Sequence, residues 1–504
     1  MHTPEHTPAH TRAQKLRDEC LRGAKYLARL LEGLGCEVRL AAHVEGKNPV
    51  VMGRLGFNPA HPTVVFYGHY DVQPALEPDW GTRPFELAAV DGYLYGRGTS
   101  DNKGPVLAFI YAVKEMLDCW QAAGGVAPLN VAFIIEGEEE NGSTGFREAL
   151  TANLGWFSDA DVVVISNTVW VGERLPCLTY GMRGMVTASI EVTGPARDVH
   201  SGNDGGVFSE PMADLFKLLA GRAIAAAARS AAAFAAAVPA ARAHRPPRAL
   251  APLTPPDRPP PRRAIGVPRL TAPPNKHDLL VARWCQPSLS VVDVRAGGAA
   301  PQGGRSLYRF GPTRFSVIPR SAVGKVSIRF VPEQDASHLI AALTAHVRAQ
   351  FEALGSANSV DVRVHSVGDW WEADPESDVF KMAERAVRRE WGVAPLYVRE
   401  GGTMPVASLI EKLLGAPALL IPMGQSSDSC HLANERLRRL NLVKGKNVVR
   451  HLMEELAAAA PAAAAVPGMV SAAAPAAPGG GGGAAGGGAL PSALAPPAAG
   501  RGAA

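Results

Sequence analysis

Apolar residues follow two different periods along the first third of the chain. Between Gln14 and Leu34 they recur every three or four positions, which predicts an amphipathic helix. A second helix-like run extends from Pro105 to Leu117. Short runs of branched and aromatic residues, typical of buried strands, lie at Val50–Leu55, Val64–Tyr67, Val131–Ile135 and Asp161–Ile165. This alternation predicts an α/β domain with a central, mostly parallel sheet flanked by helices.

The pattern changes near Gly184. In 186–192 and 325–330 apolar and polar residues alternate, which predicts antiparallel strands with one exposed face. Two helix-like runs, Pro211–Ala220 and Ala336–Leu354, and a short strand, Val360–Val364, lie in the same region. The α/β pattern returns at Ser377–Trp391, Ala418–Ile421 and Asn447–Leu456. We therefore predict a smaller α+β domain, 184–365, inserted between two parts of the α/β domain, 13–183 and 366–456.

Three segments lack the apolar periodicity of a folded domain, namely 1–12, 221–264 and 457–504. Residues 221–264 are rich in Ala, Pro and Arg, and 457–504 consist almost entirely of Ala, Gly and Pro. Such compositions bury too little apolar surface to fold, so we predict disorder in all three. For 221–264 an aberrant stretch of sequence is the alternative.

The formal charge of +4 comes from one part of the chain. Residues 221–270 hold nine Arg and one acid, whereas the rest carries 42 basic and 46 acidic residues. Nucleic-acid binding therefore has little support outside that segment. No apolar run reaches the ~20 residues of a membrane span, and the six cysteines are scattered without a CxxC pair. We predict a cytoplasmic protein with reduced thiols and no membrane or nucleic-acid partner.

Polar residues with metal-binding chemistry follow several of the predicted strands and loops. They are His69, Asp71, Asp101, Glu138–Glu140 and His431. Because ligands bind at the carboxyl ends of strands in α/β sheets, we expect these side chains to lie together. Imidazole and carboxylates are ligands of Zn²⁺ and Mn²⁺. The combination predicts a hydrolase in which a carboxylate bridges two ions ~3.5–4 Å apart.

Each position taken alone has a plainer interpretation. Glu138–Glu140 could form an exposed acidic turn, His431 a helix cap, and His200 an ordinary surface-loop histidine. Arg329, on the strand face opposite its apolar neighbours, could be solvated or could clamp a carboxylate. We interpret Cys430 as a packed thiol, and Gly96-Arg97-Gly98 lacks the full dinucleotide fingerprint.

Eight segments resemble one known family. They read FYGHYDVQPA, DGYLYGRGTSDNKGP, FIIEGEEENGS, TYGMRG, DVHSG, VIPRSAVGKVSIRFVP, REGGTMPV and SSDSCHLANERL. They occur in the order found in the zinc-dependent dipeptidase family of carnosinase, cytosolic non-specific dipeptidase and aminoacylase. The resemblance extends from Arg17 to Leu456 apart from 221–264. It implies a metallopeptidase that hydrolyses the amide bond of small peptides, with expected roles in the breakdown of glutathione and γ-glutamyl peptides.

The resemblance also implies roles for the strand-end residues. His69, Asp101, Glu140 and His431 would bind two divalent ions, Zn²⁺ or Mn²⁺, with Asp101 as the bridge. Asp71 would orient His69, and Glu139 would act as general base. Where the dipeptidases carry a further Asp ligand, this chain has Asn167, which could ligate through its carbonyl oxygen but brings no charge. The ion shared with His69 would therefore bind less tightly.

In this family the inserted domain also forms a homodimer and acts as a lid. His200 would be lent across that dimer, and Ser316, Arg329 and Thr403 would contact substrate. GKNPVV, SDNKGP and SNTVWVGE are more similar to the peptidase-like subunit of the fungal glutathione degradosome. That resemblance implies the alternative of a subunit with weak or no catalysis alone, working with a glutamine-amidotransferase-like partner. A third hypothesis is that 221–270 binds acidic polymers.

Overall fold

The fold of the α/β part agrees with the sequence prediction. The structure is a computed structural model that describes residues 9–76, 78–125, 128–220, 276–297, 316–332 and 334–459. Its largest sheet has the strand order β1-β2-β6-β3-β7-β18-β9-β16, with β17 also paired to β9. The four central strands, β6, β3, β7 and β18, are parallel. The segments 221–264 and 460–504, predicted as disordered, lie outside the described residues.

The strands of this sheet are β1 (Glu37–Ala41), β2 (Val50–Leu55), β3 (Thr63–His69), β6 (Asn130–Glu136), β7 (Ala160–Ile165), β9 (Cys177–Met182), β16 (Trp371–Glu372), β17 (Leu396–Glu400) and β18 (Ala418–Leu420). Its helices are α1 (Ala9–Gly33), α2 (Lys103–Ala122), α3 (Phe146–Ala152), α10 (Asp378–Trp391), α11 (Pro405–Leu414) and α12 (Arg439–Ala459), with 3₁₀ turns at η1 (Glu139–Asn141) and η2 (Leu154–Trp156). Two smaller sheets accompany it. In one, β5 (Tyr93–Tyr95) lies between β4 (Ala88–Val90) and β20 (Arg436–Arg438), and in the other β8 (Val169–Trp170) pairs with β19 (Gly424–Gln425).

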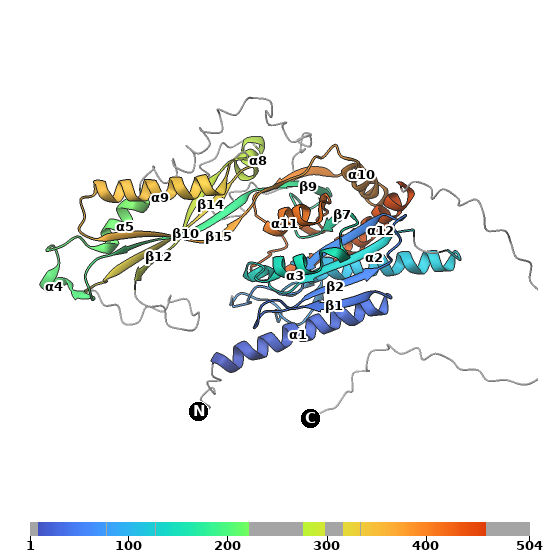
Figure 1. Ribbon diagram of the computed structural model, residues 1–504, viewed down its shortest axis with the longest axis horizontal. Helices are drawn as coiled ribbons and strands as arrows, with labels where there is room; N and C mark the ends of the chain where they lie inside the picture. Colours follow the sequence, from blue (N-terminus) through green and yellow to red (C-terminus); the bar gives the residue numbers. More distant parts are fainter. Residues whose placement is uncertain are drawn as a thin grey trace, which may run out of the picture. The chain divides into compact units, whose positions relative to one another are not determined.

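Apolar side chains on both faces of the central strands explain the helical layers. Every residue of β3 and β6 is buried. Helix α1 contacts β1 and β2, α2 contacts β3, and α11 contacts β7 and β18 (Figure 1). Gly68 allows α2 to approach closely, since a Cβ there would lie 2.5 Å from Val106. This close packing brings the loop that precedes α2 to the end of β3.

The inserted segment has its own sheet and core. Strands β12 (Ser288–Gly297), β14 (Ser321–Phe330), β10 (Gly184–Thr193) and β15 (Ser359–Gly368) form an antiparallel sheet in that order. Helices α5 (Pro211–Ala220) and α9 (Ala336–Ala353) pack against it (Figure 1). The remaining elements are α4 (Ser201–Asp204), α8 (Lys276–Trp284), and the pair β11 (Val199–His200) and β13 (Val317–Ile318). The predicted alternation is confirmed here, because Val186, Ile190 and Val192 are fully buried.

Some elements differ from the prediction. Helix α1 begins at Ala9, inside the segment predicted to be disordered, and α12 runs from Arg439 to Ala459 rather than from Asn447 to Leu456. Gly445 lies inside α12. Its lack of a side chain leaves room for Met423, whose side chain would lie 2.6 Å from a Cβ at position 445. The patterns did not predict β9, β12, β17 or α11. Among the described helices, none is both long and apolar enough to cross a membrane.

Candidate metal centre

The candidate site forms where β3 and β6 end. His69 is the last residue of β3 and pairs in parallel register with Glu136, the last residue of β6. The chain then turns into the acidic segment that carries Glu139 and Glu140 on η1. Parallel strands bring their carboxyl ends to one edge of the sheet, so the imidazole and the carboxylates become neighbours there.

Asp101 lies between the two histidines. Its Oδ1 lies 3.0 Å from His69 Nε2, and its Oδ2 lies 2.8 Å from His431 Nε2. The two histidines are 362 positions apart in the numbering of the chain and meet on opposite oxygens of one carboxylate. Asp101 therefore contacts both histidines, and the bridging role that the resemblance implies for it stays a prediction.

The His431 half of the site contains a compact set of metal-ligating atoms. Glu140 Oε2 lies 3.2 Å from His431 Nε2. Ligand atoms of Asp101, Glu140 and His431 all lie within 4.8 Å of one another. Glu140 Oε1 is buried, and within the described chain it has no hydrogen-bond partner. One imidazole, two carboxylates and an unused buried oxygen fit a divalent transition-metal ion.

The charges around this half favour a bound cation. The hydrogen bonds that His431 donates to Asp101 and Glu140 raise its pKa to about 10. Burial raises the pKa of Asp101, but the hydrogen bonds from His431 and His69 outweigh burial and hold it well below its ordinary value. The site thus stabilises positive charge strongly, which a metal ion would supply in place of the histidine proton.

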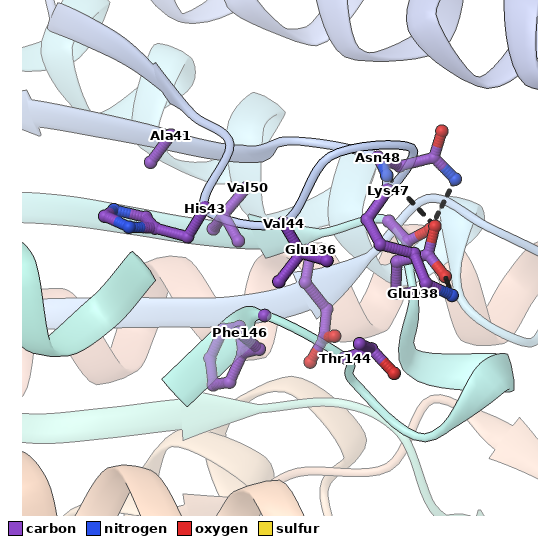
Figure 2. Close-up of a pocket in the computed structure, with 12 residues that line it drawn as sticks. Ala41, His43, Val44, Lys47, Asn48, Val50, Glu136, Glu138, Thr144 and Phe146 are labelled. Carbon is purple, nitrogen blue, oxygen red and sulfur yellow. Dashed lines mark hydrogen bonds and ion pairs between the residues drawn. The ribbon is translucent and has the colours of Figure 1, made fainter. Parts of the chain in front are cut away.

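The three neighbouring glutamates, Glu138–Glu140, make different contacts. Glu138 accepts hydrogen bonds from Lys47 Nζ at 2.9 Å and from the main-chain N–H of Asn48 at 3.0 Å. Both contacts lie at the pocket shown in Figure 2, which the buried Glu136 also lines. Glu138 is therefore paired with Lys47 and Asn48, and Glu139 and Glu140 are the members of the segment that can take part in the candidate site.

Glu139 lies next to the cluster without belonging to its compact ligand set. Its Oε2 is 3.9 Å from His69 Nε2. Burial raises the pKa of Glu139 to about 7, against the opposing effect of His69 and with the carboxylates of Asp101 and Glu140 adding to it. A carboxylate with a pKa near neutrality suits a group that accepts and returns a proton.

The His69 half of the site is buried. His69 is fully buried, and its Nδ1 lies 3.1 Å from the main-chain oxygen of Asp71 and 3.4 Å from that residue's carboxylate. The main chain therefore supplies the nearer contact to Nδ1, where the resemblance implied the Asp71 side chain. Asp71 Oδ2 instead accepts the main-chain N–H of Glu140 at 3.0 Å. Asn167 turns its amide nitrogen toward His69 Nε2, at 3.3 Å.

Glu435 connects the loops of Asp101 and His431 and was not singled out from the sequence. Its fully buried Oε1 accepts three main-chain N–H groups, from Gly98, Ser100 and Asp101, each at 3.1 Å. Its Oε2 accepts from the buried Arg97 at 2.8 Å. Arg97 and Glu435 lie 338 positions apart, so no local pattern could have paired them. Glu435 holds the Asp101 loop from a position four residues beyond His431.

The predicted substrate residues form two pairs apart from this cluster. Arg329 Nη1 donates to Thr403 Oγ1 at 2.5 Å. Ser316, which is exposed, accepts from the main-chain N–H of Ser201, beside His200. His200 Nδ1 accepts from the N–H of Gly202 and caps α4. The plain interpretation of His200 as a surface-loop residue therefore describes its contacts within one chain.

The structure describes all six cysteines. All six are free, with no disulfide among them. Burial raises the pKa of the Cys430 thiol to about 12. A thiol with a raised pKa is a poor nucleophile, which agrees with the interpretation of Cys430 as a packed side chain.

Comparison with known proteins agrees with this geometry. The family model described as Peptidase family M20/M25/M40 matches residues 65–455. The Cys-Gly metallodipeptidase DUG1 of Candida albicans is 35% identical over 416 residues, which cover 79% of each chain. The Beta-Ala-His dipeptidase of Homo sapiens is 35% identical over 421 residues, covering 81% of this chain and 78% of that protein. A solved structure of the di-peptidase Dug1p from Saccharomyces cerevisiae has a TM-score of 0.70 and 31% identity, and the match covers 88% of this chain and 92% of that one. The chain described here belongs to peptidase family M20/M25/M40.

Proposed function

We propose that this chain is a metal-dependent dipeptidase that hydrolyses the amide bond of small peptides such as Cys-Gly, a step in glutathione breakdown. The observation that carries the proposal is the position of Asp101 between His69 and His431, with Glu140 beside His431 and Glu139 beside His69. The names of the relatives at 35% identity support a dipeptide as the substrate.

Asp101, Glu140 and His431 would hold a divalent ion, Zn²⁺ or Mn²⁺. Such an ion acts as a Lewis acid that polarises a carbonyl and lowers the pKa of water. Glu139 Oε2 would take a proton from the attacking water and give it to the nitrogen of the leaving amine. Asp71 would support Glu140 through the hydrogen bond to its main-chain N–H.

Arg329 and Thr403 would bind the free carboxylate of the peptide. The Arg329 guanidinium is half-buried, and burial lowers its pKa while Glu400 opposes that effect. A partly desolvated guanidinium beside a hydroxyl suits a carboxylate. His200 and Ser316 would contact substrate in the same way only if a second copy of the chain brings them to the site, which makes a homodimer part of the proposal. The free thiols support a reducing compartment such as the cytoplasm.

Hydrolysis assays before and after metal removal test this function. We expect the purified full chain to cleave Cys-Gly and to lose that activity after treatment with a chelator. Activity should return on addition of Zn²⁺ or Mn²⁺ and should not return with Ca²⁺. Failure of the metal-loaded chain to cleave any dipeptide would reject the proposal.

The same preparation tests the subunit alternative. Cleavage that appears only after a glutamine-amidotransferase-like partner is added would favour it. The names of the 35%-identical relatives favour activity of the chain by itself.

A further inference from the structure

Two main-chain groups fix the orientation of the Asn102 amide. Asn102 is fully buried; its Oδ1 accepts the N–H of His69 at 3.3 Å, and its Nδ2 donates to the main-chain oxygen of Ser166 at 2.6 Å. A main-chain N–H can only donate and a carbonyl can only accept. Exchanging the oxygen and nitrogen of Asn102 would therefore break both contacts.

The orientation of Asn102 determines the orientation of Asn167. Asn102 Nδ2 also donates to Asn167 Oδ1, at 3.0 Å. The oxygen of Asn167 is thus used by a donor whose direction cannot be reversed. Its nitrogen consequently faces His69 Nε2, at 3.3 Å. The carbonyl ligand expected from the sequence points away from the histidine.

His69 has a matching hydrogen-bond arrangement. Its Nδ1 faces the main-chain oxygen of Asp71 at 3.1 Å, which can only accept, so this nitrogen carries a proton. Its Nε2 lies 3.0 Å from Asp101 Oδ1 and 3.3 Å from Asn167 Nδ2. A cation bound to Nε2 in place of a proton would meet the Asp101 carboxylate and, at position 167, an N–H instead of a second oxygen.

We propose that Asn102 and Asn167 close the His69 half of the site to a divalent ion, so that the chain holds one ion, on Asp101, Glu140 and His431. This inference rests on the proposed function, since it assigns the ion that the hydrolase would use. It differs from the two-ion expectation in one interaction, the contact between the side chain at position 167 and His69. An aspartate at 167 would present one oxygen to Asn102 and a second, charged oxygen to the His69 side.

Metal stoichiometry tests the inference without relying on activity. The metal-free full chain is titrated with Zn²⁺ by calorimetry, and the loaded, dialysed protein is analysed by mass spectrometry. We expect one tightly bound ion in the unchanged chain and two in Asn167→Asp. With Mn²⁺, electron paramagnetic resonance should show an isolated ion in the first and a spin-coupled pair in the second.

Two further variants serve as controls. Asn153→Asp adds the same charge at a half-buried position in another loop and should leave the stoichiometry at one. His431→Ala in the Asn167→Asp background should remove the ion of the His431 half. The stoichiometry of each variant can be interpreted if the variant is folded, which cooperative unfolding on heating would show.

The outcomes separate this inference from the proposed function. Two tight ions in the unchanged chain together with Cys-Gly hydrolysis would overturn the inference and leave the function standing, and this result needs no variant. A stoichiometry that stays at one in a folded Asn167→Asp protein would also overturn it. An unchanged chain that binds no ion and cleaves nothing would overturn both.

Discussion

The two histidines on either side of Asp101 lie in opposite surroundings. His69 ends a central strand, is fully buried, and meets a main-chain oxygen, an amide and one oxygen of Asp101 around its ring. His431 belongs to a loop, its side chain is 53% exposed, and its Nε2 faces two carboxylates. Its φ of 65° is a left-handed conformation that a non-glycine residue rarely adopts. Both rings meet carboxylates, but His69 is buried at the end of a strand and His431 lies in a loop with an exposed side chain.

From this difference we expect that burial and metal affinity do not coincide. Burial orients His69 well, but the amide at position 167 adds no charge to offset that of a divalent ion. The His431 half groups the carboxylates of Asp101 and Glu140 around one imidazole. We therefore expect ion binding to follow the charged ligands of the His431 half.

The largest expected effect concerns the proton transfer that we assign to Glu139. Glu139→Gln keeps the size of the side chain but cannot accept the proton, so hydrolysis should fall by about 10²-fold or more. The ion content should stay unchanged, because Glu139 is outside the compact ligand set. Turnover of Cys-Gly and metal analysis of the same sample check this prediction. Loss of the ion would instead show that Glu139 and Glu140 have exchanged roles.

The next effect distinguishes the halves directly. His431→Ala removes one of three clustered ligands and should weaken Zn²⁺ binding by more than the ~10–100-fold typical of outer contacts. His69→Ala removes no member of that cluster and should weaken it less. Calorimetric titration of both metal-free variants gives the comparison. Equal losses would mean that the two halves share the ion.

A smaller effect is expected at Glu435, which contacts the site only through the main-chain N–H of Asp101. Glu435→Gln keeps one acceptor oxygen but places an NH₂ group against either Arg97 or the three N–H groups. The Asp101 loop should shift, and Zn²⁺ affinity should fall by about 10–100-fold. Glu411→Gln is the matched control, because Glu411 accepts from Trp371 and the N–H of Ala418 elsewhere in the same sheet. Weakening of similar size in both variants would indicate a general loss of stability.

The smallest effect lies at the other end of β3. Asp159 accepts from Arg54, Arg54 itself being buried, and from Thr63, the first residue of that strand. Burial raises the pKa of Asp159, but these hydrogen bonds outweigh it and lower the pKa below its ordinary value. Because the Asp159 side chain is 43% exposed, we expect Asp159→Asn to cost only about 1–2 kcal/mol at pH 7.

The sign of the pH dependence follows from the lowered pKa. The stabilisation is complete above the pKa of the unfolded chain and is lost as the pH falls from there toward the lower pKa of the folded state. Urea unfolding at pH 7 and near pH 3 should therefore show a difference between the two proteins that shrinks at the lower pH. Ion affinity should stay the same at pH 7. A change there would mean that the two ends of β3 are coupled.

Much of the fold could be predicted from local pattern. The buried runs that became β2, β3, β6 and β7 are apolar on both faces, and the alternation in β10 and β14 identified a half-exposed sheet. Strand β9 could not be found in this way, since Thr179 and Gly181 interrupt its apolar run although all six of its residues are buried. Its burial depends on neighbours from distant parts of the chain.

For the candidate site, residue types and order along the chain determined which side chains could take part. His69, Asp101, Glu140 and His431 were identified because imidazoles and carboxylates follow predicted strands or lie in loops, in the order found in a known family. Only the tertiary structure decided how each is used. In the folded chain Glu138 accepts from Lys47, Glu435 accepts from the N–H of Asp101, and the amide nitrogen of Asn167 faces His69. A hydrogen bond depends on distance and direction between groups far apart in the chain, and no local pattern in a sequence contains either.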